Sequence, residues 1–275
     1  MTVANQRLTA DELSQLDRDG YVLRERAFGR DELAQIIESC ESLLADLVKD
    51  RRGRRYKVGS YVFEPDALTD VTVKWEGDSD TVHGIEPFAH LSPELEQLAY
   101  DPRFIGPSAD FVGDDEPILF TEKLNLKRPQ VGGANPWHQD YPYWADADDR
   151  TRIVTALLFL DDATLENGTL QVIPGSHKLG QWPLRTDQDA FGNLEMDPTA
   201  TEGRAVRAIE VEAGALVFFG PFLVHKSEPN RSDTDRRVLL FSYQPQGLRH
   251  GLEIWQAQRR EYEARSSATE GGAGA

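Results

Sequence analysis

The chain has 275 residues and a formal net charge of −17, from 30 Lys and Arg against 47 Asp and Glu. So acidic a chain is not expected to bind nucleic acid, because that binding relies on basic surface to neutralise phosphates. No apolar stretch approaches the roughly 20 residues of a membrane span, and the N-terminus lacks a basic and then apolar signal. Cys40 is the only cysteine, which excludes an internal disulfide. We therefore expect a cytoplasmic protein that engages neither nucleic acid nor membrane.

The N-terminal part favours helices. Thr9, with Glu12 three residues later, forms a capping-box signature, and Gly20 ends a short first helix. Residues 21–28 are typical of an edge strand. Apolar positions then recur at helical spacing over residues 31–48, which predicts an amphipathic helix packed against the outer face of a sheet.

The pattern changes to short strands towards the C-terminal half. Two more helices are expected first, at Ser92-Pro93-Glu94 and after Asp101-Pro102, because proline suits a first helical turn. Apolar and β-branched runs separated by Gly, Pro, Asn and Asp then predict strands. These strands span residues 117–127, 134–141, 152–160, 169–174, 206–211, 215–219, 222–227 and 236–244.

Two four-stranded layers built from these runs predict a mainly β fold with flanking α-helices, a double-stranded β-helix of the jelly-roll, cupin-like type. The mouth of such a fold can enclose a ligand. We expect one domain over residues 1–265, with a helical part at about 8–112 and a jelly-roll core at about 115–245. Residues 266–275 are small and polar, which is typical of a disordered tail.

His138 and Asp140 stand two residues apart in a segment expected to be extended, so the period of a strand places both side chains on one face. His225 follows an apolar run and is the candidate for a third ligand from a distant strand. Two histidines and one carboxylate that leave the remaining positions open suit Fe(II) in oxygenases that bind O2 and a co-substrate at the metal.

Arg236 lies eleven residues beyond His225, at the start of a strongly β-like run. A 2-oxoglutarate molecule chelates iron through one end, so its far carboxylate needs a fixed partner, and the planar fork of an arginine supplies two charge-assisted hydrogen bonds. Ser227 shares the strand face of His225 and can donate its hydroxyl to the same carboxylate.

The chain resembles the phytanoyl-CoA dioxygenase family of Fe(II)/2-oxoglutarate oxygenases, which includes ectoine hydroxylases and many tailoring enzymes. The similarity covers roughly residues 8 to 250. The residues that carry it are Asp19-Gly20-Tyr21, His138-Gln139-Asp140, Glu166-Asn167-Gly168-Thr169-Leu170, Val172-Ile173-Pro174-Gly175-Ser176-His177, His225-Lys226-Ser227 and Arg236.

The resemblance implies a set of ligands and an activity. The iron ligands are His138, Asp140 and His225, and the 2-oxoglutarate contacts are Arg236, Ser227, Asn125 and Thr155. The implied reaction uses Fe(II), 2-oxoglutarate and O2 to hydroxylate a small-molecule metabolite and releases succinate and CO2. Asp140 argues against halogenation, because halogenating relatives carry a small residue there. Desaturation, epimerisation and cyclisation remain as alternatives.

Two other classes of protein are alternatives. A non-catalytic cupin-like module that captures a metal or carboxylate would lack a co-substrate pocket, which Asn125, Ser227 and Arg236 together oppose. A metal-dependent hydrolase or isomerase would need a general acid or base near the metal. Glu166 and Asp161 qualify only by proximity in the sequence.

The substrate is the open question. The acidic signature of the ectoine branch is absent after the metal motif, where aromatic residues form either a pocket wall or core: Trp137, Tyr141, Tyr143 and Trp144. The basic run at residues 49–57 is either a solvated loop or an anion clamp. His177 is expected to shape a turn. Lys127 could assist a carboxylate, but a lysine at a strand end is expected to be solvated. We expect a free small molecule and a monomer or homodimer.

Overall fold

The computed structural model describes residues 3–49, 53, 55–58, 61–66, 68–77, 79–185, 194–257 and 260. The tail expected at residues 266–275 lies outside this range, as do three arginines of the basic run, Arg51, Arg52 and Arg54. In the part of the chain that is described, no helix has the length and apolar character needed to cross a membrane.

The helices begin and end where their capping residues predict. In α1 (Ala10–Asp19) the Thr9 side chain accepts a hydrogen bond from the backbone of Glu12, and the Glu12 carboxylate accepts one from the backbone of Thr9. Gly20, with a φ of 85°, ends this helix in the left-handed conformation that glycine adopts without strain. Helix α2 (Arg30–Lys49) is one residue longer at each end than predicted. The others are α3 (Pro93–Ala99), α4 (Pro102–Val112), a helical segment at 251–257, and the 3-10 helices η1 (Val3–Gln6), η2 (Ala89–Leu91), η3 (Tyr141–Trp144), η4 (Arg150–Arg152), η5 (Ser176–Leu179) and η6 (Pro198–Thr201).

The strands form two antiparallel sheets, which confirms the predicted jelly-roll, cupin-like fold. The larger sheet has the order β1-β11-β8-β13-β6-β5-β4-β3-β2, and the smaller has the order β10-β9-β12-β7. The strands are β1 (Tyr21–Arg24), β2 (Tyr56–Val58), β3 (Tyr61–Pro65), β4 (Thr72–Trp75), β5 (Val82–Glu86), β6 (Ile118–Lys127), β7 (Asn135–His138), β8 (Val154–Phe159), β9 (Leu170–Val172), β10 (Arg207–Ala208), β11 (Leu216–Phe219), β12 (His225–Ser227) and β13 (Arg236–Gln244).

The structure differs from the sequence prediction in the extent of several strands. The strands predicted at 206–211 and 222–227 are shorter, as β10 and β12. Residues 56–86, grouped with the helical N-terminal part, form the four strands β2 to β5 and extend the larger sheet at one side. Strand β1 ends at Arg24, short of the predicted residue 28. Strand β7 ends at His138, so the chain turns before Asp140.

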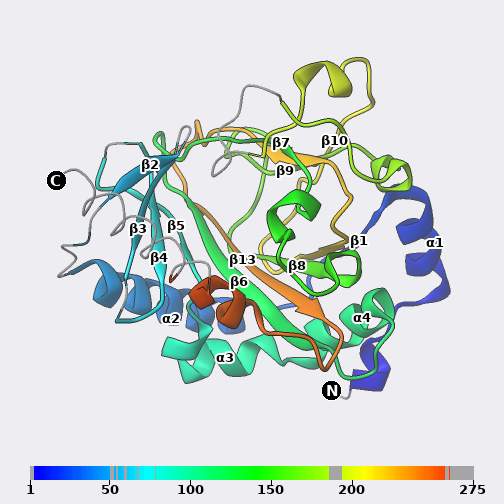
Figure 1. Ribbon diagram of the computed structural model, residues 1–275, viewed down its shortest axis with the longest axis horizontal. Helices are drawn as coiled ribbons and strands as arrows, with labels where there is room; N and C mark the ends of the chain where they lie inside the picture. Colours follow the sequence, from blue (N-terminus) through cyan, green and yellow to red (C-terminus); the bar gives the residue numbers. More distant parts are fainter. Residues whose placement is uncertain are drawn as a thin grey trace, which may run out of the picture.

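The two faces of the larger sheet bury different cores. Leu239 and Phe241 of β13 join the cluster that the helices cover, whereas Val238 joins the cluster between the two sheets. Figure 1 shows α2, α3 and α4 on one side of β6 and β13, with β7, β9 and β10 on the other. Full burial of a side chain such as Phe241 stabilises the fold by about 1.5–3 kcal/mol. Because side chains alternate along a strand, the residues of β13 that face the smaller sheet are Arg236, Val238, Leu240 and Ser242.

Candidate metal and co-substrate site

Three side chains converge between the sheets in an arrangement that fits one metal ion. His138 on β7 and His225 on β12 are direct partners in the antiparallel pairing of these strands. The Nε2 atom of each histidine lies 3.9 Å from Oδ1 of Asp140. One ligand atom from each of the three residues falls within 4.8 Å of the other two. The structure thus brings together the three ligands that the sequence predicted.

Backbone contacts orient both imidazoles. Nδ1 of His138 lies 2.7 Å from the carbonyl oxygen of Pro136, and Nδ1 of His225 lies 3.0 Å from that of Leu223. A carbonyl can only accept, so each Nδ1 carries the proton and each Nε2 keeps a free lone pair. Such contacts fix the tautomer of a metal-binding histidine. Burial and the neighbouring His225 lower the pKa of His138 well below its usual value, which favours the neutral form that binds a metal.

Asp140 reaches the site by a turn and not by strand alternation, which corrects the reasoning from sequence. Its backbone is α-helical, with φ −72° and ψ −25°, at the start of η3. The fully buried Gln139 holds this turn, because its amide nitrogen donates to the carbonyl oxygens of Gly180 (2.9 Å) and Phe222 (2.7 Å) and its amide oxygen accepts from the backbone of Trp182 (2.8 Å). Gln139 is the middle residue of the family motif, but no pattern in the sequence predicted these partners.

Thr155 lies against Asp140. Its Oγ1 is 3.4 Å from Oδ2 of Asp140 and 3.1 Å from Oγ of Ser242 on the neighbouring strand β13. The predicted contact of Thr155 with co-substrate therefore competes with a contact that holds the metal-binding carboxylate. Ser242 was not predicted as a site residue. It lies an even number of residues from Arg236 on the same strand, so the alternation of side chains could have identified it.

Arg236 and Arg237 have opposite environments. Arg237 donates to both oxygens of Asp161, at 2.9 and 2.7 Å, and to Glu41 at 2.9 Å. The side chain of Arg236 faces inward, the residue is only 4% exposed, and its Nε has no hydrogen-bond partner among the residues that the structure describes. Burial lowers the pKa of Arg236 to about 10. A buried guanidinium without a paired carboxylate fits an anionic ligand, because an unpaired buried charge is costly.

Lys127 lies beside Arg236 in the sheet and is buried, contrary to the expected solvated position. Its ammonium donates to the carbonyl oxygen of Gly133. Burial, and then the charge of Arg236, lower the pKa of Lys127 to about 6. Two basic side chains therefore share one buried region, and an anionic ligand there would favour the charged form of Lys127.

The other two predicted co-substrate residues flank this region. Oγ of Ser227 accepts a hydrogen bond from Nδ2 of Asn135 at 3.2 Å, which leaves its own hydroxyl proton free for a ligand. Asn125 stands opposite Val238 of β13 and is half-buried on the inward face of β6. Asn135, which the sequence did not single out, also accepts from the Tyr61 hydroxyl at 3.3 Å.

The four aromatic candidates separate into different environments. Tyr143 lies edge-on to His138, with ring centroids 5.9 Å apart, so it borders the ligand group. Tyr141 stacks on Phe222 at 4.4 Å. The two tryptophans pack in cores, which is the other alternative: Trp144 belongs to a separate buried cluster with Phe120, and Trp137 packs beside the cluster that contains Trp182.

The remaining candidates are occupied elsewhere. Asp161, considered as a general acid or base, is engaged by Arg237. His177 lies against Gly20, where an added Cβ would come within 2.3 Å of its Nδ1, which agrees with a role in shaping a turn. In the described part of the basic run, Arg55 pairs with Glu64 at 3.1 Å and Asp80 at 2.9 Å.

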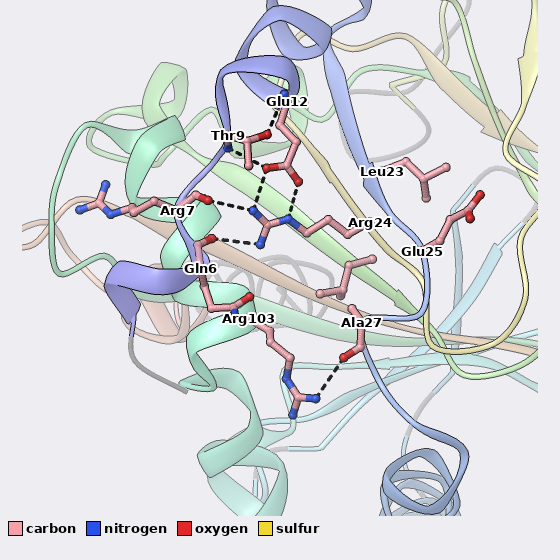
Figure 2. A pocket seen from close by; sticks show the side chains of 10 residues that line it. Gln6, Arg7, Thr9, Glu12, Leu23, Arg24, Glu25, Ala27 and Arg103 are labelled. Atoms are coloured by element: carbon pink, nitrogen blue, oxygen red, sulfur yellow. Dashed lines mark hydrogen bonds and ion pairs between the residues drawn. The ribbon is translucent and has the colours of Figure 1, made fainter.

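A separate hollow of about 460 Å³ lies between the N-terminal segment, β1 and α4 (Figure 2). Its guanidinium groups are already paired, since Arg24 binds Glu12 and Arg103 binds the carbonyl oxygen of Ala27. Leu216 on its wall belongs to the core on the helix-covered face of the sheet, whereas Phe219 of the same strand contacts His225. This hollow is therefore on the opposite face from the ligand group.

Comparison with known proteins agrees with this geometry. A profile of the phytanoyl-CoA dioxygenase (PhyH) family matches residues 16–238. L-Proline trans-4-hydroxylase of Streptomyces griseoviridis is 33% identical over 181 residues, which cover 59% of this chain and 66% of that protein. Ectoine dioxygenase of Sphingopyxis alaskensis is 31% identical over 237 residues, covering 81% and 71%. The crystal structure of EctD from S. alaskensis with 2-oxoglutarate and 5-hydroxyectoine superposes with a TM-score of 0.69 at 25% identity, covering 86% of this chain and 76% of that one.

A jelly roll that gathers two histidines and an aspartate between its sheets defines an iron- and 2-oxoglutarate-dependent oxygenase. Iron and 2-oxoglutarate supply the oxidising chemistry, in which O2 is consumed and 2-oxoglutarate becomes succinate and CO2. The chain belongs to the phytanoyl-CoA dioxygenase (PhyH) family. This confirms the resemblance drawn from the sequence motifs.

Proposed function

We propose that this enzyme hydroxylates a small-molecule metabolite. In this proposal His138, Asp140 and His225 hold Fe(II), and Arg236 binds the far carboxylate of 2-oxoglutarate. The observation that carries the proposal is the buried Arg236, whose Nε has no partner, on the sheet face that also presents the residues around the metal ligands. A non-catalytic metal-binding module gives no reason to keep such a cation buried.

Ser227 and Asn125 complete the co-substrate site in this proposal. The free hydroxyl proton of Ser227 suits a carboxylate oxygen, and the half-buried amide of Asn125 can donate from the same sheet face. Thr155 acts mainly as a positioning residue, because its hydroxyl lies against Asp140. Desaturation, epimerisation and cyclisation consume the same co-substrates, so product analysis distinguishes them from hydroxylation.

The test of the activity begins without O2. Fe(II) and 2-oxoglutarate are added to the purified protein, and the weak visible charge-transfer band of their chelate is measured. O2 is then admitted with candidate metabolites, and succinate is quantified. A band that forms in the parent and is absent from His225→Ala supports the site, and succinate above the substrate-free rate identifies a substrate. Absence of the band in the parent would contradict the proposal.

We further propose that the enzyme works in the cytoplasm as a monomer or homodimer and does not bind nucleic acid. The net charge of −17 supports the last point. Burial raises the pKa of the Cys40 thiol to about 12, so this lone cysteine is an inert core residue suited to any compartment, including a reducing one. Light scattering after size exclusion measures the oligomeric state.

A further inference from the structure

Lys74 is a lysine of the larger sheet that has a ring but no carboxylate against its ammonium. Nζ lies 3.2 Å from the ring centroid of Tyr61 and 5.9 Å from that of Phe63. Among the described residues, no carboxylate comes within ion-pair distance of it. Burial lowers the pKa of Lys74 to about 7, so the charged form is costly without an anionic partner. The ammonium therefore lacks one anionic partner.

Strands β3 to β6 form one wall on the inward face of the larger sheet, and this wall also carries an ion pair. Nζ of Lys123 on β6 lies 2.8 Å from Oε2 of Glu86 on β5, and both side chains remain about one-third exposed, at 38% and 33%. Glu86 is thus already directed to Lys123. The other nearby carboxylate, Glu76, accepts from the backbone of Gly133 at 2.7 Å and contacts His83 at 2.8 Å. Neither acid is placed to pair with Lys74.

This wall adjoins the ligand group. The charges of Lys123 and Lys74 both act to lower the pKa of His138, and the charge of Asp140 acts on Lys123. Lys74 contacts the ring of Tyr61. The hydroxyl of this tyrosine donates to the carbonyl oxygen of Ala134 at 3.2 Å, next to the start of β7. Lys74 therefore lies on the part of the sheet that faces the strand of His138.

Gly84 separates Lys74 from the co-substrate region by backbone alone. It is paired with Lys74 on one side and with Asn125 on the other. A Cβ at this position would lie 2.9 Å from Oδ1 of Asn125 and 2.8 Å from the carbonyl oxygen of Leu124, so a side chain does not fit. Lys74 and Asn125 are thus separated only by the backbone of Gly84, and the side chain of Asn125 lies against this glycine.

We propose that the substrate carries a carboxylate and that Lys74 binds it, with the Lys123–Glu86 pair beside it. One ammonium without a carboxylate partner matches one negative charge, and a carboxylate supplies it in a form that also accepts two hydrogen bonds. Lys74 is then a substrate-binding residue on the wall between β3 and β5. This inference rests on the proposed function, since it places the substrate next to iron and 2-oxoglutarate.

The test uses acid and amide pairs. Acetate, benzoate and indole-3-acetate, each with its primary amide, are titrated calorimetrically into the anaerobic enzyme saturated with Fe(II) and 2-oxoglutarate. We expect at least one acid to bind tenfold or more tightly than its amide in the parent. Lys74→Met should abolish that preference, and Lys74→Arg should retain most of it. Lys57→Met on β2 is the matched control, because Lys57 is exposed, and it should behave as the parent does.

The outcomes separate the two proposals. The charge-transfer band of the Fe(II)–2-oxoglutarate chelate should be unchanged in Lys74→Met, and its absence in the parent would overturn the proposed function before Lys74 is tested. With the band present, equal affinity for acid and amide in all three pairs would overturn the role of Lys74, as would a preference that survives Lys74→Met. Phenyl phosphate that binds more tightly than benzoate through Lys74 would overturn the assignment to a carboxylate.

Discussion

Replacing Arg236 by glutamine tests the co-substrate site most directly. Loss of one hydrogen bond to a charged group costs about 1.5–3 kcal/mol. At about 1.4 kcal/mol for each factor of ten, the dissociation constant for 2-oxoglutarate should rise about 10- to 150-fold. Iron affinity without co-substrate should stay within about twofold, because Arg236 is not a ligand.

The same substitution is expected not to destabilise the protein without ligands. Arg236 is 4% exposed and its Nε is unpaired, so Arg236→Gln removes a buried charge that no described carboxylate binds. Removing such a charge relieves a desolvation cost. The melting temperature of the protein without ligands should therefore be unchanged or higher, although binding is impaired.

Arg237→Gln is the matched control. This substitution breaks the hydrogen bonds to Asp161 and Glu41, at 2.7–2.9 Å, and leaves Asp161 partly buried without its partner. A cost of about 1.5–3 kcal/mol is expected, and the melting temperature falls by about 2–4 °C per kcal/mol for a chain of about this size. Binding of 2-oxoglutarate should be retained.

The assay is an anaerobic titration of 2-oxoglutarate into the iron-loaded protein, followed by its visible band, with thermal unfolding of the ligand-free protein in parallel. Normal binding of 2-oxoglutarate by Arg236→Gln, together with impaired binding by Arg237→Gln, would refute the assignment of Arg236 to the co-substrate. It is also refuted if Arg236→Gln lowers the melting temperature as much as Arg237→Gln does, because Arg236 would then be a structural cation.

Three further predictions concern the metal end of the site. His138→Ala, Asp140→Ala and His225→Ala should each abolish iron-dependent succinate formation with an unchanged circular dichroism spectrum, and near-normal iron affinity in any two of them would contradict the ligand assignment. Thr155→Val should raise the Fe(II) concentration needed for half-saturation by about 2- to 13-fold, from the about 0.5–1.5 kcal/mol of one hydrogen bond; a larger effect on 2-oxoglutarate would show direct contact with co-substrate. Fe(II) at a hundredfold excess over its dissociation constant should stabilise the parent by about 2.7 kcal/mol, measured as a rise in melting temperature that His138→Ala loses.

Local rules predicted the parts of the fold that depend on nearby residues. The capping box of Thr9 and Glu12 and the C-terminal Gly20 were confirmed because each involves contacts within one helical turn. The inward face of β13 was also predictable, because side chains alternate along a strand and the inward side of Arg236 fixes the side of the residues that follow. The three residues that converge as candidate iron ligands were predicted because their types, order and spacing are specific in combination.

The substrate wall was not predictable in the same way. Strands β3 to β5 are short, and their inward positions hold Lys74 and Glu86 where a strand pattern expects apolar residues. Strand propensity depends strongly on neighbours, and of these strands only β5 pairs with β6, which joins β3 to β5 to the rest of the sheet. The burial of Lys127 and the three partners of Gln139 likewise depend on segments distant in sequence.

The strand order of the larger sheet separates two tasks. Arg236, Asn125 and Thr155 lie on the adjoining strands β13, β6 and β8 in its middle, where each strand is held on both sides. Lys74 and Tyr61 lie on β4 and β3, near one edge. Strands β3 and β4 are also short, with five and four residues against ten in β6 and nine in β13, so substitutions on them disturb a shorter stretch of pairing. New substrates could therefore be accommodated by redesigning β3 and β4 while the strands that serve iron and 2-oxoglutarate are left intact.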